Sequence, residues 1–241
     1  MTFAKLLITA VFLLAMTIQD FAHEGVRQDN SGELSGPADS YVYRLAEPGT
    51  YELPAIKPAA GGMVLDERGK PHELKHLLRG HLTILAFIYT RCGDLCPLAT
   101  MRMAQLKDQA ARLTVKGLRL ITMSFDPDYD TPERMAEFAK PWREAEALSG
   151  NSWLFLTAPS RQAVEPLLSA YGQPLSPRAD EGDGSGTISH LMRVFLIDDL
   201  GLIRNIYSPD FLDPRLMLND LLTIDTSSLA AKPKRSGSQG E

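Results

Sequence analysis

Two cysteines are the residues of this sequence whose type and spacing best suit chemistry. Cys92 and Cys96 are the only cysteines among 241 residues, within the run TRCGDLCP. On a turn that leads into a helix, this spacing puts both sulfurs on one side, where Cα atoms about 4.4–6.8 Å apart permit a disulfide. The same closeness would let both thiolates bind one metal ion. The pair therefore predicts metal binding, thiol redox chemistry or a disulfide.

The type of metal follows from the donors. Two thiolates are too few for a closed structural zinc site, which takes four ligands. Soft sulfur donors with one imidazole suit Cu(I). On spacing alone a structural disulfide stays open, although so short a loop yields the least entropic stabilisation. A helix beginning near Pro97 would bring the positive end of its dipole to Cys96, which favours the thiolate.

The cysteines fall between a predicted strand and a predicted helix of an alternating chain. Near-continuous apolar, β-rich runs predict buried strands, and helical spacing after capping residues or prolines predicts helices. The order indicates an α/β fold, a thioredoxin-like central sheet flanked by helices with a C-terminal β-hairpin and helix. In such sheets chemistry gathers beyond the carboxyl ends of the strands. The predicted strands are 81–90, 118–125, 152–156, 190–197 and 202–207, and the helices are 98–113, 130–140, 159–171 and 213–222.

The ends of the chain differ in composition from its middle. Lys5 and the apolar run from Leu6 to Ile18 resemble a secretion signal, too short to span a bilayer about 30 Å thick. The alternative is an uncleaved membrane anchor. Either reading predicts an exported, periplasmic protein, in which a disulfide can persist. The expected organisation is a signal peptide or anchor at 1–22, a linker at 23–49, a copper-binding domain at 50–225 and a disordered tail at 226–241.

Composition excludes one class of partner. The net charge is -5, whereas binding to nucleic acid requires a basic face that neutralises phosphates. The hydrophobic fraction of 44% and charged fraction of 23% are ordinary for a globular domain. We expect no nucleic-acid partner.

Three segments in this order resemble signatures of the Sco/SenC family. These are FIYTRCGDLCP at 87–97, FDPDYDTPE at 125–133 and HLMRVFLID at 190–198. Members of that family are copper chaperones associated with assembly of the binuclear copper centre of cytochrome c oxidase. The resemblance covers about residues 60–225.

The resemblance implies a site and a function. Cys92, Cys96 and His190 would bind copper as Cu(I) and also as Cu(II), and the cysteines would cycle between dithiol and disulfide. The expected partner is a copper-accepting subunit of a respiratory enzyme. The alternative is a thiol-disulfide oxidoreductase that reduces the cysteines of a copper acceptor and is itself served by a thiol reductant protein. Gly93 departs from the proline usual in the family, which would loosen the loop.

Other polar residues carry weaker expectations. Asp130 or Thr131 is expected to cap a helix, while Asp126 orders a loop and could lie behind a ligand. His72 and His76 would share a face if their segment were helical, which is a weak metal signal.

Overall fold

An eight-stranded mixed sheet is the centre of the fold. The computed structural model describes residues 33–35, 42–93, 95–113, 115, 117–143, 151–173 and 191–231. The strand order is β3-β10-β9-β6-β7-β8-β4-β5, with β6, β7 and β8 parallel and the other pairs antiparallel. The strands are β3 (Lys57–Pro58), β4 (Met63–Asp66), β5 (Pro71–Glu73), β6 (Leu82–Ile88), β7 (Leu118–Ser124), β8 (Ser152–Thr157), β9 (Val194–Ile197) and β10 (Leu202–Tyr207).

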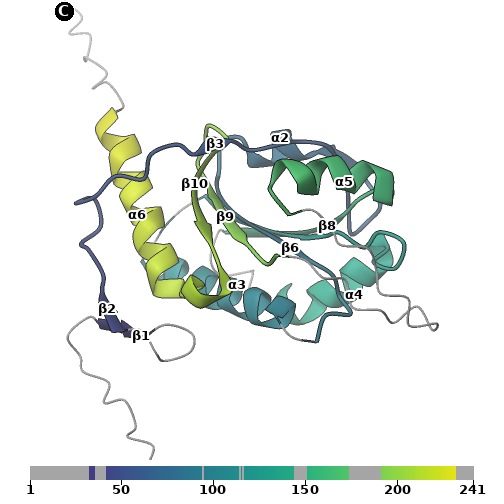
Figure 1. Ribbon diagram of the computed structural model, residues 1–241, viewed down its shortest axis with the longest axis horizontal. Coiled ribbons are helices and arrows are strands. Elements are labelled where there is room, and N and C mark those ends of the chain that lie inside the picture. The colour runs from purple at the N-terminus through teal and green to yellow at the C-terminus, as the bar shows by residue number, and fades with distance from the viewer. Residues whose placement is uncertain are drawn as a thin grey trace, which may run out of the picture. The chain divides into compact units, whose positions relative to one another are not determined.

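Helices cover both faces of this sheet (Figure 1). Helices α2 (Leu74–Leu78) and α5 (Arg161–Ala170) lie on one face. Helices α3 (Leu95–Arg112), α4 (Pro132–Arg143) and α6 (Pro214–Ala231) lie on the other. Because helices bury both faces of the sheet, the central strands are almost continuously apolar. A 3-10 turn, Pro209–Phe211, separates β10 from α6.

Successive side chains of β6 point alternately into two separate hydrophobic cores. Leu85 and Phe87 belong to the core beneath α2 and α5, whereas Ile84 and Ala86 belong to the core beneath α3, α4 and α6. The ring of Phe87 lies 5.1 Å from that of Tyr171 and 6.2 Å from that of Phe195. These rings pack α5 against β6 and β9.

Strand register determines which loops meet at the edge that carries the cysteines. β6 and β7 run in parallel, with Ile88 opposite Ser124, so the segments that follow them leave the sheet side by side. β9 runs antiparallel to β6, with Val194 opposite Ala86. The chain therefore enters β9 from the edge at which β6 ends.

The five predicted strands and the closing hairpin are confirmed, with differences at some ends. The strand expected from residue 190 begins at Val194. Helix α3 begins at Leu95 rather than beyond Pro97, and α4 continues through Pro141 to Arg143. Helix α6 extends past its predicted end at 222 to Ala231.

The region before residue 80 holds structure that the sequence pattern did not reveal. Strands β3, β4 and β5 and helix α2 are short, and segments of two to five residues carry too little periodicity to identify. Within the segment expected to be a linker, β1 (Glu33–Ser35) and β2 (Val42–Arg44) form a separate antiparallel pair.

Residues that follow β2 are attached to α6 through a partly buried polar cluster. The Asp220 carboxylate accepts hydrogen bonds from the hydroxyls of Tyr51 at 2.6 Å and Tyr207 at 2.7 Å, and from the Asn205 amide at 2.8 Å. We name these four residues the Asp220 cluster. Asn219 also donates to the Ala46 carbonyl at 2.6 Å. The C-terminal end of the predicted linker is thus hydrogen-bonded to the domain.

Candidate functional site

Both cysteines lie where β6 leads into α3, in a segment of residues 89–96 that includes the first residues of the helix and is here named the cysteine loop. Cys92 is half-buried and packs against the core, and Cys96 in the first turn of α3 is 2% exposed. Both are thiols, and their side chains lie close enough to interact with each other. The Cys92 amide donates to the Tyr89 carbonyl at 3.2 Å, which closes a turn ahead of the helix. The predicted closeness of the sulfurs is confirmed.

The expectation of a thiolate at Cys96 is wrong. Burial raises the pKa of the Cys96 thiol well above its usual range, and the neighbouring Cys92 and Asp130 raise it further. The helix dipole contributes only about 0.3–1 kcal/mol, whereas full burial can shift a pKa by up to about 3–5 units. Cys96 is therefore protonated at neutral pH in the metal-free protein.

A second loop lies against the cysteine loop and carries two buried carboxylates. This segment, residues 125–130, follows β7 and is here named the aspartate segment. Its Asp130 carboxylate accepts hydrogen bonds from the Thr90 amide at 3.0 Å, from the Thr90 hydroxyl and from the Ser124 hydroxyl at 2.5 Å. Asp130 therefore holds the cysteine loop, and the cap of α4 is Thr131, which accepts from the Arg134 amide at 3.4 Å.

Asp126 holds the next residue of the cysteine loop. Its carboxylate pairs with the Arg91 guanidinium at 2.8 Å and lies 3.6 Å from that of Arg161 at the start of α5. The Asp126 carbonyl accepts from the amides of Tyr129 and Asp130, so the expected role in ordering the loop is confirmed. The Tyr129 ring is stacked between Arg91 at 4.1 Å and Arg134 at 3.8 Å.

His190, the third predicted ligand, lies outside the described residues. The described chain resumes at Leu191, and the buried Met192 precedes β9 at the edge shared with the cysteine loop. Within the described part of the chain, no group of three or more His, Cys, Asp or Glu side chains could hold a metal ion. The structure therefore brings two of the three predicted donors together.

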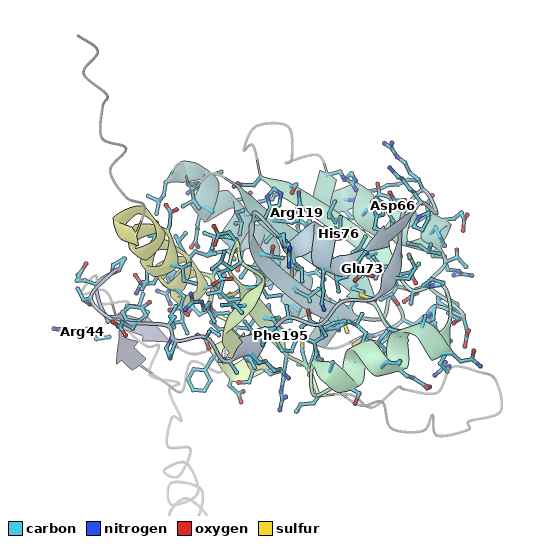
Figure 2. All side chains as sticks on the ribbon, turned by 90° about the horizontal axis from the view of Figure 1, so that it is seen from above. Arg44, Asp66, Glu73, His76, Arg119 and Phe195 are labelled. Carbon is cyan, nitrogen blue, oxygen red and sulfur yellow. The ribbon has the colours of Figure 1, made fainter. Side chains whose placement is uncertain are left out.

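The other histidines do not form a metal site among the described residues. His72 lies in β5 and His76 in α2, so the two do not share a helix, and Figure 2 shows His76 and Asp66 on separate elements. The His72 ring bonds the Asp66 carboxylate at 2.9 Å across the β4–β5 pair.

Thr90 and Arg91 are the contacts that sequence reasoning missed. The available signal was register: parallel strands that end together bring the residues after them into contact. Arg91 directly precedes Cys92, and its partner Asp126 follows β7 by two positions.

A family model matches most of this domain. The SCO1/SenC model aligns with residues 63–224. The chain belongs to the SCO1/SenC family. This SCO1/SenC chain is 29% identical, over 142 residues, to a Stutzerimonas stutzeri protein named for copper binding. It is also 32% identical, over 88 residues, to the SCO1 protein homolog of Bacillus subtilis (strain 168). The matches cover 58% and 36% of this chain, and 64% and 43% of those relatives, less than two thirds of either.

Solved structures share the fold of this SCO1/SenC chain. Copper-bound ScoI of Arabidopsis thaliana matches with a TM-score of 0.61 at 19% identity, over 70% of this chain and 98% of that one. The apo Sco1 protein of Thermus thermophilus matches with a TM-score of 0.60 at 24% identity, over 73% and 95%. A SCO1/SenC family lipoprotein of Bacillus anthracis matches with a TM-score of 0.59 at 23% identity, over 72% and 95%. These likenesses establish the thioredoxin-like fold.

Proposed function

We propose that this chain is an exported copper chaperone that binds one copper ion through Cys92, Cys96 and His190. The observation that carries the proposal is the contact between two thiols at the carboxyl edge of the sheet. Two sulfur donors in contact can bind one soft ion without rearrangement of the fold. Copper is the cargo here, so the site must release it as well as bind it.

The strand topology supports His190 as the third ligand. Residues 191–193 enter β9 at the edge where the cysteine loop lies, and His190 directly precedes them in the sequence. Two thiolates and one imidazole would leave a coordination position on copper for a donor atom of the receiving protein. An open position favours transfer by ligand exchange over permanent storage.

Relatives support the cargo and the destination. The Arabidopsis thaliana structure contains copper, and a solved relative called BsSco is described as a member of the Sco family of cytochrome c oxidase assembly proteins. We infer that a respiratory copper enzyme, such as the copper centre of cytochrome c oxidase, accepts copper from this chain. The lipoprotein relative and the predicted export segment support a periplasmic location with anchoring at the membrane. Among the described residues no helix is long and apolar enough to cross a membrane.

Binding of Cu(I) is coupled to protons at this site. Cys96 is protonated in the metal-free chain, because burial raises its pKa. Only a thiolate binds the metal, so copper binding must release the Cys96 proton. The burial that keeps this thiol protonated also shields the bound ion from water.

A thiol-disulfide reductase is the second candidate, favoured by the unequal exposure of the two sulfurs. The half-buried Cys92 would attack the acceptor's disulfide as a thiolate, forming a mixed disulfide and displacing one acceptor thiolate. The buried Cys96 would lose its proton and attack Cys92, which releases the second acceptor thiolate. The products are a reduced acceptor and a Cys92–Cys96 disulfide, which a thiol reductant protein would reduce again.

Anaerobic titration of the reduced chain with Cu(I) tests the first candidate. We expect one copper per chain, no tight binding in Cys92→Ser or Cys96→Ser, and strongly weakened binding in His190→Ala. Copper held by His190→Ala as tightly as by the wild type would contradict the three-ligand site. Catalytic reduction of a disulfide substrate by a chain that binds no copper would favour the second candidate.

A further inference from the structure

The cysteine loop is constrained from outside itself. Gly93 between the two cysteines is exposed, and a Cβ built on it meets no atom within 4 Å. Gly93 itself therefore makes no packing contact that would hold the loop in place. The constraint comes from the aspartate segment, which bonds the residues just before Cys92.

Asp130 uses both carboxylate oxygens for this purpose. One oxygen accepts from the Thr90 amide and from Ser124, and the other accepts from the Thr90 hydroxyl. Thr90 is thus fixed by its backbone and its side chain, two positions before Cys92. Asp130 is fully buried, so water does not compete for these bonds.

Asp126 fixes the intervening residue. Its carboxylate pairs with Arg91, whose guanidinium also lies on the Tyr129 ring. The aspartate segment is itself anchored, since the Asp126 amide donates to the Ser124 hydroxyl at 3.1 Å and the Phe125 amide donates to the Ile88 carbonyl at 3.0 Å. A rigid turn after β7 therefore supports each of the two residues that lead to Cys92.

We propose that Asp130 and Asp126 are positioning residues that hold Cys92 at the separation from Cys96 at which the two sulfurs act as a pair. The copper part of this inference rests on the proposed function, whereas the thiol-disulfide part does not. A loop held in advance loses little conformational entropy when a disulfide closes or an ion binds. Release of the loop should therefore weaken both processes.

The decisive comparison is Asp130→Asn against Asp220→Asn. Both substitutions remove the charge of a buried carboxylate that accepts three hydrogen bonds, but only Asp130 touches the cysteine loop. Two readouts are measured on the purified full chain: its disulfide equilibrium with dithiothreitol, and its Cu(I) dissociation constant by chelator competition. Urea unfolding shows whether the two variants lose comparable stability.

We expect Asp130→Asn to lower the equilibrium constant for disulfide formation about tenfold, a rise in potential of about 30 mV. We expect its Cu(I) dissociation constant to rise roughly 10- to 100-fold, the usual cost of losing support behind a ligand. Asp220→Asn should match the wild type in both readouts. Equal readouts for Asp130→Asn and Asp220→Asn would overturn the proposal.

Thr90→Val and Thr90→Ser keep the test decisive if Asp130→Asn does not fold. Valine removes the hydroxyl bond to Asp130 and keeps the shape, so it should shift both readouts in the same direction by a smaller factor. Serine keeps the hydroxyl and should restore wild-type values, and failure of this rescue would contradict the proposal. A wild-type chain that binds no copper would remove the proposed function, and the disulfide equilibrium alone would then decide the positioning role.

Discussion

Two buried carboxylates in this protein have the same hydrogen-bonding arrangement and different surroundings. Asp130 and Asp220 are each almost inaccessible to water, and each accepts three hydrogen bonds from other segments of the chain. Asp220 joins α6 to β10 and to the segment before the sheet, where every partner is a structural residue. Asp130 joins the ends of β6 and β7, where its partner Thr90 is two residues from Cys92.

The difference teaches that the same interaction can stabilise a fold in one place and prepare a site in another. Loss of either carboxylate leaves buried donors without acceptors, which costs about 1–3 kcal/mol for each donor. Only at Asp130 does that loss also release the cysteine loop. Stability measurements alone therefore cannot distinguish the two positions, whereas thiol and copper measurements can.

Alanine at either position should have the largest effect on stability. Asp130→Ala leaves the Thr90 amide and two hydroxyls without acceptors, and Asp220→Ala leaves two phenols and one amide without acceptors. We expect each variant to lose about 3 kcal/mol of unfolding free energy, measured by urea denaturation of the metal-free chain. If only one of the two variants lost less than about 1 kcal/mol of unfolding free energy, the comparison would fail, because the two carboxylates would then not stabilise the fold equally.

Alkaline pH should act on the Asp220 cluster through its phenols. Burial, followed by the hydrogen bond to Asp220, raises the pKa of Tyr51 from 10.0 to about 12, and burial raises the pKa of Tyr207 as well. The folded state then binds more protons than the unfolded state above pH 10. The contribution of Tyr51 to the unfolding free energy should be fully present below pH 10 and should be lost as the pH rises through about 12.

Urea denaturation at a series of pH values from 8 to about 12 measures how steeply the unfolding free energy falls with pH. Tyr51→Phe removes the phenol, so its stability should fall less steeply with pH in the alkaline range. A wild-type slope identical to that of Tyr51→Phe would show that Tyr51 ionises equally in both states.

Gly93→Ala should have the smallest effect. The added Cβ meets no atom within 4 Å, and the backbone of Gly93 is not in the left-handed region. We expect a change in unfolding free energy of no more than about 1 kcal/mol, in the stabilising direction, because alanine restricts the unfolded chain. The Cu(I) dissociation constant should stay at its wild-type value. A large change in copper affinity would show that the loop backbone, rather than the aspartate segment, sets the geometry.

Much of the fold could be predicted because its signals are local. The apolar runs of β6 and β7 are long enough to identify, and the sequence alone singles out the cysteines and both aspartates. The short strands β3, β4 and β5 of the main sheet were missed because they are defined by pairing with other strands rather than by a local pattern. Local patterns cannot reveal such pairings.

The parts of the site that sequence could not supply depend on tertiary contacts. The prediction for Cys96 used the helix dipole, which follows from sequence position, and omitted burial, which depends on packing. Asp130 had the residue type and position of a helix cap, but the parallel register turned its carboxylate to Thr90. The copper ligand set stays a prediction, because its third member lies outside the described residues.

The register that places Ile88 opposite Ser124 has a consequence for any transplantation of this site. The two loops beyond those residues are bonded to each other, although Phe125 lies 33 positions after Cys92 in the sequence. Moving the CxxxC turn alone into another parallel sheet would transfer the sulfurs without their support. A functional graft needs the segments that follow both β6 and β7. The host protein must have two neighbouring parallel strands that end in the same register, as Ile88 and Ser124 do here.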